Sequence, residues 1–241
     1  MFKNRRWRYF VWSLREGKPM CGRFTFDIPL EVLVEIFGLK EISEIRPSYN
    51  IAPTQQVSVV RQVSDHNSLI LMKWGLVPSW AKDPAIGSQM INARAETVAE
   101  KPSFRHAIKY RRCIVPGSGF FDWKHEGKNK QPYYFRMKNG RPIGFAGIWE
   151  EWKAPDGTLL DTFSILTTTA NDLVAPVHER MPVIVPPDDY GIWLNKHLTD
   201  PEELKQFYEP FPAKLMDAYP VSERVNTVRN NSPENIVRVT P

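Results

Sequence analysis

The first clear pattern of apolar residues along the chain has the period of a helix. Between Pro29 and Gly38 the apolar positions recur every three or four residues, which places them on one face. Proline suits a first helical turn, and glycine commonly follows a last one. The spacing therefore predicts one amphipathic helix over residues 29–38.

The middle of the chain follows a different pattern, in which short runs of β-branched and aromatic residues are separated by turn residues. Asn139-Gly140 is typical of a two-residue hairpin, and Pro155-Asp156-Gly157 predicts a second turn. The runs predict strands at residues 57–63, 69–73, 112–115, 119–125, 133–138, 143–152 and 159–169.

Helical patterns return in short pieces. We expect a short basic helix near residues 104–110 and two more near 188–197 and 201–208, the last capped by Thr199 or Asp200. Strands that meander between short helices indicate an α+β fold. The chain is therefore predicted to form a single domain with a curved, mostly antiparallel, barrel-like β-sheet and short flanking helices.

The net charge of the whole chain indicates little about binding partners, but the local distribution of charge is informative. The net charge of +5 lies entirely in residues 1–19, where six basic residues face one glutamate, and the rest of the chain carries 26 basic and 26 acidic residues. Residues 101–141, however, hold eleven Lys and Arg against Asp122 and Glu126. A basic face on a neutral protein suits a polyanion, although a solvated charged surface explains it equally well.

Residues 1–19 are unlike the remainder, being basic and aromatic without the apolar stretch of a secretory signal. We interpret them as a leader or a mis-called upstream start, with the domain proper spanning residues 20–241. No apolar run is long enough to span a bilayer. The two cysteines form no CxxC pair and no histidine has metal-ligand spacing, so we expect no metal or other cofactor and a reducing cytoplasm.

Cys21 follows Met20 directly. If translation starts at Met20 and the methionine is trimmed, Cys21 becomes an N-terminal residue with a thiol and an α-amine on adjacent carbons. Such a pair can capture an aldehyde as a five-membered thiazolidine ring, which an internal cysteine cannot do. The alternative is that Cys21 is a small buried hydrophobic residue, as we expect for Cys113.

Four further polar residues occupy unusual settings. Asn92 and Arg94 fall in a short alanine-rich stretch, and Asp122 is flanked by aromatic residues, where a carboxylate can serve as a general acid or base unless it faces outward from its strand. His178 lies in a loop that enters a strand. Its side chain is suited to proton transfer near neutral pH, although a lone histidine is more often structural.

Eight short segments in order along the chain carry these residues. They are Met20-Cys21-Gly22-Arg23-Phe24, Tyr49-Asn50-Ile51-Ala52-Pro53, Trp74-Gly75, Ile91-Asn92-Ala93-Arg94-Ala95-Glu96-Thr97, Cys113-Ile114-Val115-Pro116, Gly119-Phe120-Phe121-Asp122-Trp123, Lys130-Gln131-Pro132 and His178-Glu179-Arg180-Met181-Pro182. Together they resemble the SRAP domain (SOS response-associated peptidase) family, the abasic-site shielding proteins.

The resemblance implies a mechanism. The amine of Cys21 would attack the ring-opened aldehyde of an abasic site in single-stranded DNA to form a Schiff base, and the thiol would close a thiazolidine. His178 would assist opening of the sugar ring, Asn92 would hold the sugar or the cysteine, and Asp122 would steer proton transfers at the amine and help reverse the crosslink. The implied DNA-facing residues are Arg23, Asn50, Trp74, Arg94 and Arg180. The resemblance also implies a location at the nucleoid when damaged DNA is bound, and we take a monomer as the default oligomeric state.

The chain departs from the family pattern in two ways. The family usually has glutamate where this chain has Asp122, which is shorter by one methylene. With residues 1–19 attached, Cys21 has no free amine, so crosslinking requires a start at Met20 or removal of the leader. Two other functions stay open, namely a cysteine-dependent (auto)peptidase that uses Cys21, Asp122 and His178, and a non-catalytic module that binds single-stranded DNA.

Overall fold

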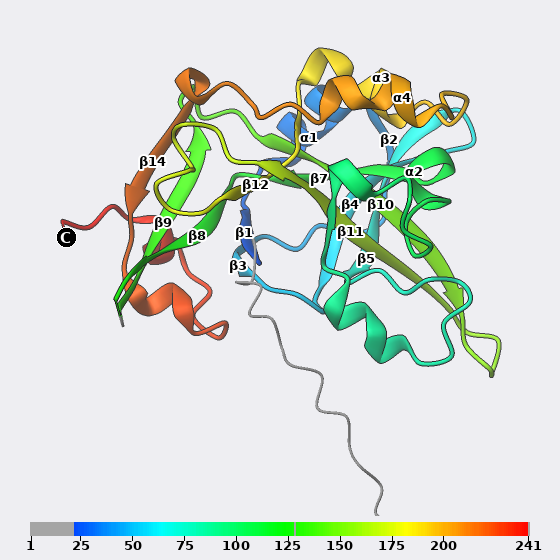
Figure 1. The fold of residues 1–241 in the computed structure, drawn as a ribbon, viewed down its shortest axis with the longest axis horizontal. Coiled ribbons are helices and arrows are strands. Elements are labelled where there is room, and N and C mark those ends of the chain that lie inside the picture. The colour runs from blue at the N-terminus through cyan, green and yellow to red at the C-terminus, as the bar shows by residue number, and fades with distance from the viewer. Residues whose placement is uncertain (1–21, 128, 241) are drawn as a thin grey trace, which may run out of the picture.

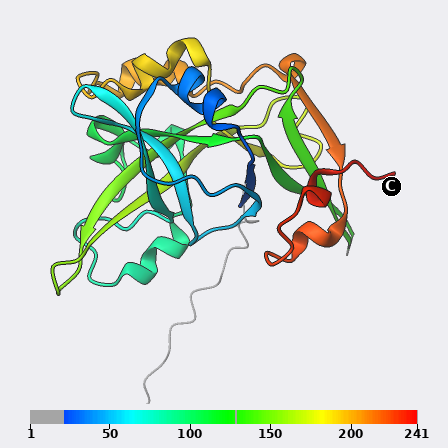
Figure 2. The ribbon, with the colours of Figure 1, turned by 180° about the vertical axis from the view of Figure 1, so that it is seen from behind.

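A computed structural model describes residues 22–127 and 129–240, which form two β-sheets flanked by short helices (Figure 1). The predicted leader, residues 1–19, and Cys21 lie outside these described residues. The view from behind in Figure 2 shows the larger sheet on one side and the smaller sheet, with the C-terminal segment, on the other.

The larger sheet closes into a barrel. Strand β11 pairs with β10 on one side and, in parallel, with β5 on the other, where Phe163 lies opposite Trp74. The strands β11, β10, β7, β4 and β5 thus complete a ring, which β12, β2, β6 and β13 extend. The bounds are β2 (Leu39–Ile42), β4 (Gln56–Val63), β5 (His66–Trp74), β6 (Asn92–Arg94), β7 (Arg112–Gly117), β10 (Ile143–Lys153), β11 (Leu159–Thr169), β12 (Arg180–Pro182) and β13 (Ile184–Val185).

The smaller sheet is antiparallel throughout. Its order is β14 (Met216–Pro220), β9 (Asn129–Met137), β8 (Gly119–Glu126), β1 (Arg23–Phe26) and β3 (Ser48–Ile51). The first strand of the chain therefore lies between two strands that follow it much later in the sequence. Together the two sheets confirm the predicted fold class of a single α+β domain with a curved, mostly antiparallel, barrel-like sheet.

The prediction of a hairpin at Asn139-Gly140 is wrong. Gly140 does have the left-handed conformation of a turn, with φ of 70°, and Asn139 Oδ1 accepts a hydrogen bond from the Arg141 N–H at 3.0 Å. The flanking strands β9 and β10 belong to different sheets, however, because β9 pairs with β8 and β14 while β10 pairs with β7, β11 and β13. The local turn is as predicted, and the tertiary pairing is not.

The helices are short and cover the outside of the sheets. Helix α1 (Leu30–Phe37) ends at Gly38, whose φ of 59° makes it the predicted terminating residue. The others are α2 (Ala107–Tyr110), α3 (Tyr190–Leu194) and α4 (Pro201–Leu204), and Asp200 caps α4 by accepting from the Glu202 N–H at 2.9 Å. In the described part of the chain, no helix has the length and apolar character needed to cross a membrane. Short 3₁₀ helices occupy Pro84–Gln89, Ala95–Thr97, Pro187–Asp189, Lys205–Phe207, Ala213–Leu215, Glu223–Asn226 and Pro233–Ile236.

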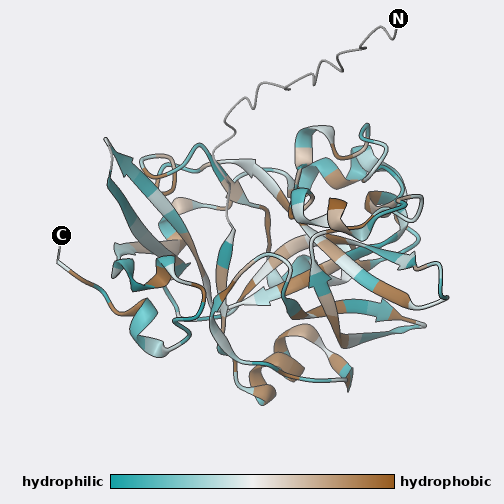
Figure 3. Cartoon of the chain, turned by 90° about the horizontal axis from the view of Figure 1, so that it is seen from below, coloured by the Kyte–Doolittle hydropathy of each residue, from teal (hydrophilic) through white to brown (hydrophobic). Residues whose placement is uncertain are grey.

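Aromatic side chains fill the core where the two sheets meet. Trp74 is fully buried between Phe24, in edge-to-face contact at 5.2 Å, and Phe163, stacked at 6.2 Å between ring centroids. Cys113 is also buried with a free thiol, as expected for a core residue, and burial raises its pKa. Figure 3 shows hydrophobic and hydrophilic residues interspersed along the strands. Strands β7 and β12 are buried along their whole length.

Candidate active-site cavity

A cavity of about 330 Å³ opens where the first strand of the chain enters the smaller sheet. Both sheets contribute to its wall, together with the C-terminal segment. The lining residues are Gly22, Arg23, Pro53, Ile91, Asp122, Trp123, His125, Lys130, His178 and Asn226. Three residues that the sequence singled out, Arg23, Asp122 and His178, are therefore brought together although up to 155 positions separate them.

The register of β1 against β8 directs the N-terminal residues toward this cavity. Arg23 lies opposite Phe121, and the ladder is antiparallel, so Gly22 approaches the β8 residue that follows Phe121, which is Asp122. Gly22 lines the cavity and is bonded directly to Cys21. Although Cys21 itself lies outside the described residues, its covalent neighbour stands at the cavity wall beside Asp122.

Asp122 occupies the middle of β8 and is only 2% exposed. Its Oδ1 accepts a hydrogen bond from the Trp123 N–H at 2.9 Å. The alternative that Asp122 is a solvated residue on the outer face of its strand is thus overturned. A buried carboxylate held in this way at a cavity wall is suited to exchange protons with a bound group.

His178 precedes β12 and reaches the cavity from the larger sheet. Its Nδ1 accepts a hydrogen bond from the backbone N–H of Arg180 at 3.0 Å. An imidazole that accepts at Nδ1 carries its proton on Nε2 when it is neutral. The backbone of β12 therefore fixes both the tautomer and the orientation of a buried histidine.

Asn92 and Arg94 lie on β6, which pairs in parallel with β11. Neither residue lines the cavity, but Ile91, the residue before Asn92, does. Arg94 is exposed on the surface at the other end of this short strand. The strand thus places an amide beside the cavity wall and a guanidinium in solvent.

Arg180 forms a bidentate ion pair with Glu96. Its Nη1 and Nη2 donate to the two carboxylate oxygens at 2.5 and 2.8 Å, and Nη2 also donates to the Thr167 carbonyl at 2.6 Å. These hydrogen bonds lower the pKa of Glu96. In this conformation the Arg180 guanidinium is buried and engaged, so a phosphate would have to replace Glu96 to reach it.

Arg23 and Asn50 hold the C-terminal segment against the cavity. Asn50 Nδ2 donates to the carbonyls of Val225, Thr227 and Asn230 at 3.2, 3.1 and 2.8 Å. Arg23 Nη1 donates to Asn50 Oδ1 at 2.8 Å and to the Val225 carbonyl at 2.7 Å, and burial lowers the pKa of Arg23. The structure therefore places Asn50 in the interior, where it organises the chain around the site.

Trp74 is likewise interior, because its ring packs in the core and its Nε1 donates to the Ile91 carbonyl at 2.8 Å. The indole at the cavity belongs instead to Trp123, whose Nε1 donates to Asn226 Oδ1 at 2.7 Å. Sequence reasoning overlooked His125 and Asn226 as wall residues, and no local pattern marks them. Trp123 and Lys130 do fall within the short segments singled out in the sequence, and this position was the only signal that they line the site.

No group of three or more His, Cys, Asp or Glu side chains among the described residues is arranged to hold a metal ion. The cavity wall offers the Asp122 carboxylate, the imidazoles of His125 and His178, and two cations, Arg23 and Lys130. This set can transfer protons and attract an anion.

A single domain with a closed five-stranded barrel and an acid–histidine cavity at the first strand defines the class of protein. Residues 20–228 match the family described as SOS response associated peptidase (SRAP), and the chain belongs to that family.

Named relatives and solved structures agree with this assignment. The chain is 43% identical over 221 residues to the abasic site processing protein YoqW of Bacillus subtilis, covering 90% of this chain and 99% of the relative. It is 34% identical to the abasic site processing protein HMCES of Gallus gallus, covering 80% of this chain and 67% of the relative. A crystal structure of a protein from Bacteroides thetaiotaomicron superposes with a TM-score of 0.74 at 33% identity, covering 80% of this chain and 85% of that one.

Proposed function

We propose that this protein processes abasic sites in single-stranded DNA by forming a covalent crosslink through Cys21. One observation carries the proposal: a single cavity gathers Asp122, His178 and Gly22, the residue bonded to Cys21. The names of the relatives, which are abasic site processing proteins, support the choice of substrate.

The chemistry uses both functional groups of an N-terminal cysteine. The neutral α-amine adds to the aldehyde carbon of the ring-opened sugar, and loss of water gives an imine. The Cys21 sulfur then attacks the imine carbon while the nitrogen gains a proton, which closes the thiazolidine. No oxidant or cofactor enters this balance, but the α-amine must be free, so residues 1–20 must be absent from the active protein.

Two side chains of the cavity supply the proton transfers. His178, with its Nδ1 occupied by the Arg180 N–H, would present Nε2 to the sugar and assist ring opening. Asp122 would accept a proton from the Cys21 ammonium, which makes the amine nucleophilic, and would return it when the crosslink is reversed. Asn92, which follows the wall residue Ile91, would hold the sugar or the cysteine through its amide.

The DNA strand would be held by cations around the cavity. Arg23 and Lys130 line the wall, and Arg94 is exposed on β6. Arg180 would contribute by exchanging Glu96 for a phosphate, whereas Asn50 and Trp74 would act from the interior by supporting the wall. Trp123 adds an aromatic surface against which an unpaired base could stack.

A denaturing gel tests the proposal. A chain that begins at Met20, with intact mass confirming Cys21 as the first residue, is incubated with single-stranded DNA that contains one abasic site. A stable shifted band is expected, and it should be absent with Cys21→Ala or when residues 1–19 remain attached. Absence of a band from the correctly processed protein would overturn the proposal and favour a non-catalytic DNA-binding module.

The description of the family favours one alternative, a cysteine-dependent (auto)peptidase. Cys21 would attack the peptide bond as a nucleophile with Asp122 and His178 as helpers, and removal of the leader would be its first product. Peptide hydrolysis needs the thiol but not the α-amine. Incubation of the full chain followed by mass spectrometry tests the peptidase, because self-cleavage before Cys21 would support it and a stable full chain would argue against it. Self-cleavage would also free the α-amine of Cys21, so crosslinking is tested separately by the gel.

A further inference from the structure

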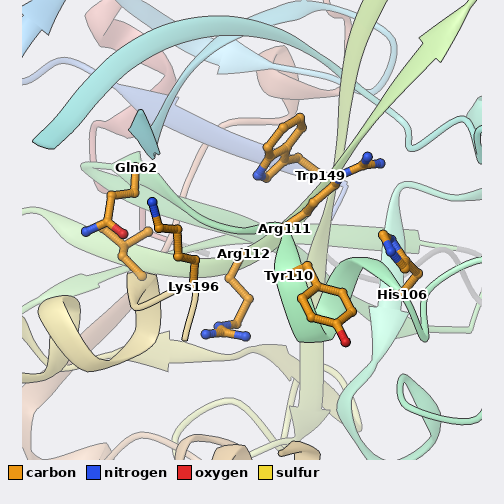
Figure 4. Close-up of a pocket in the computed structure, with 8 residues that line it drawn as sticks. Gln62, His106, Tyr110, Arg111, Arg112, Trp149 and Lys196 are labelled. Atoms are coloured by element: carbon orange, nitrogen blue, oxygen red, sulfur yellow. The ribbon is translucent and has the colours of Figure 1, made fainter. Parts of the chain in front are cut away.

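A second and larger cleft, of about 470 Å³, lies beside α2 and shares no residue with the candidate active-site cavity (Figure 4). Strand β7 separates the two sites. It begins at Arg112 in this cleft and ends at Gly117, next to which Ser118 donates a hydrogen bond to Thr25 of β1. Six strand residues span about 17 Å, so the cleft is a distinct location and not an extension of the cavity.

The segment that forms one wall of this cleft is strongly basic. Residues 101–112 contain five Lys or Arg and no Asp or Glu. Lys101 and Arg105 are exposed and Lys109 is half-buried, and none of the three forms an ion pair with any residue that the structure describes. This part of the surface therefore carries positive charge that the fold itself does not neutralise.

One arginine of the segment, Arg112, has a structural role at the cleft. The Arg112 guanidinium donates to the carbonyls of Ile108, Lys109 and Trp193, at 2.8, 2.8 and 2.6 Å. These contacts tie α2 and the end of α3 to β7 at the cleft. This guanidinium is already satisfied, and Arg111 is paired with the buried Glu150. A ligand would therefore meet Lys196, whose Nζ donates to the Ser64 carbonyl at 3.2 Å and lies 3.9 Å from the exposed Asp65 carboxylate that a phosphate would replace.

Aromatic rings accompany the charge. Tyr110 is 52% exposed, and its ring lies 5.0 Å from that of His106 on the same side of α2. Deeper in the cleft, the Arg111 guanidinium lies 5.4 Å from the ring centroid of Trp149. Figure 4 shows Tyr110 and His106 on one side of the cleft and Lys196 with Gln62 on the other. An exposed ring that faces a cation across an open cleft is the combination that binds single-stranded nucleic acid, by stacking on bases and by attraction of phosphates.

We propose that the cleft beside α2 is a second binding site for single-stranded nucleic acid, with Tyr110 stacked on a base and Lys196 at a phosphate. Lys109 and Arg105 would attract the neighbouring phosphates. The proposal goes beyond abasic-site processing, because this contact requires neither a lesion nor the Cys21 amine. The site would hold undamaged strand at a fixed separation from the cavity.

Fluorescence anisotropy with lesion-free oligothymidylates of about 20 and about 5 nucleotides tests the proposal, since single-strand sites usually span about 4–16 nucleotides. The variant Tyr110→Ala/Lys196→Gln is compared with Lys214→Gln, which neutralises an exposed lysine that lines neither site. The double variant should bind the longer strand about tenfold more weakly than the native protein. The slope of log affinity against log salt is negative, and it should become shallower by about 0.7 because one lysine–phosphate contact is lost. Lys214→Gln should match the native protein.

Equal affinities of the double variant and Lys214→Gln for the longer strand would overturn the proposal, provided that both variants have the same unfolding temperature as the native protein. The result is independent of the proposed function. Cys21→Ala should retain the lesion-free binding, and the double variant should still crosslink a short oligonucleotide with an abasic site. If the native protein fails to crosslink while the double variant binds lesion-free DNA more weakly than the native protein, only the catalytic proposal is refuted.

Discussion

The Nδ1 atom of His178 accepts a hydrogen bond from the backbone N–H of Arg180 at 3.0 Å. Because Nδ1 accepts this bond, a neutral His178 ring in this orientation carries its proton on Nε2. The donating N–H belongs to β12, which pairs with β11 through Arg180 and Thr169. Nε2 is therefore the nitrogen that we propose takes part in proton transfer at the cavity.

His178→Gln should slow crosslink formation about a hundredfold, the lower end of what one general acid or base contributes. Glutamine keeps a polar side chain of similar length but cannot transfer a proton at neutral pH. Single-turnover gel assays with excess protein measure the rate. His197→Gln is the matched control, because this histidine lies outside the cavity, and it should react at the native rate. A native rate for His178→Gln would exclude the histidine from proton transfer.

Asp122 sets a second expectation, which concerns reversal of the crosslink. Its carboxylate reaches about 1.5 Å less far than the glutamate usual in the family, a displacement on the scale that costs up to about a hundredfold in rate. Asp122→Glu should therefore release the DNA faster while forming the crosslink at a similar rate. Release is measured by transfer of the protein to a competing abasic oligonucleotide. Identical release rates for the two proteins would contradict this role.

The strands were predictable because alternation and β-branched runs are local signals, and the runs at residues 143–152 and 159–169 became β10 and β11. Pairing was not predictable at Asn139-Gly140, because strand partners are chosen by contacts far away in sequence. The same holds for the site. Asp122 and His178 stood out as polar residues in apolar or loop settings, but the burial of Asn50 depends on a segment 175 positions later.

Asn50 leads to a prediction about stability. Its amide satisfies three carbonyls of the C-terminal segment and also accepts from Arg23, and it is 1% exposed. Asn50→Ala removes these buried hydrogen bonds, although each of the three carbonyls keeps a second donor, namely Arg23 Nη1, the Asn230 N–H and Asn235 Nδ2. The free energy of unfolding should fall by about 2–4 kcal/mol, since each lost hydrogen bond costs about 0.5–1.5 kcal/mol. Urea denaturation measures the loss. Asn139→Ala, in an exposed turn, should cost less than about 1 kcal/mol. Similar losses for both variants would refute a special role for Asn50.

The ion pair between Arg180 and Glu96 predicts a pH dependence. Because the hydrogen bonds from Arg180 lower the pKa of Glu96 in the folded protein, the stabilisation is present above the unfolded pKa and is lost as the pH falls through the folded one. The native protein should therefore exceed Glu96→Gln in stability at neutral pH, and the difference should shrink below about pH 4, where the glutamate of the unfolded chain is protonated. Urea denaturation across this pH range measures both proteins. Glu100→Gln, an exposed glutamate outside any ion pair with a described residue, is the control and should follow the native curve at every pH. A constant difference between native protein and Glu96→Gln down to the acid limit would show that the pair does not act through its charge.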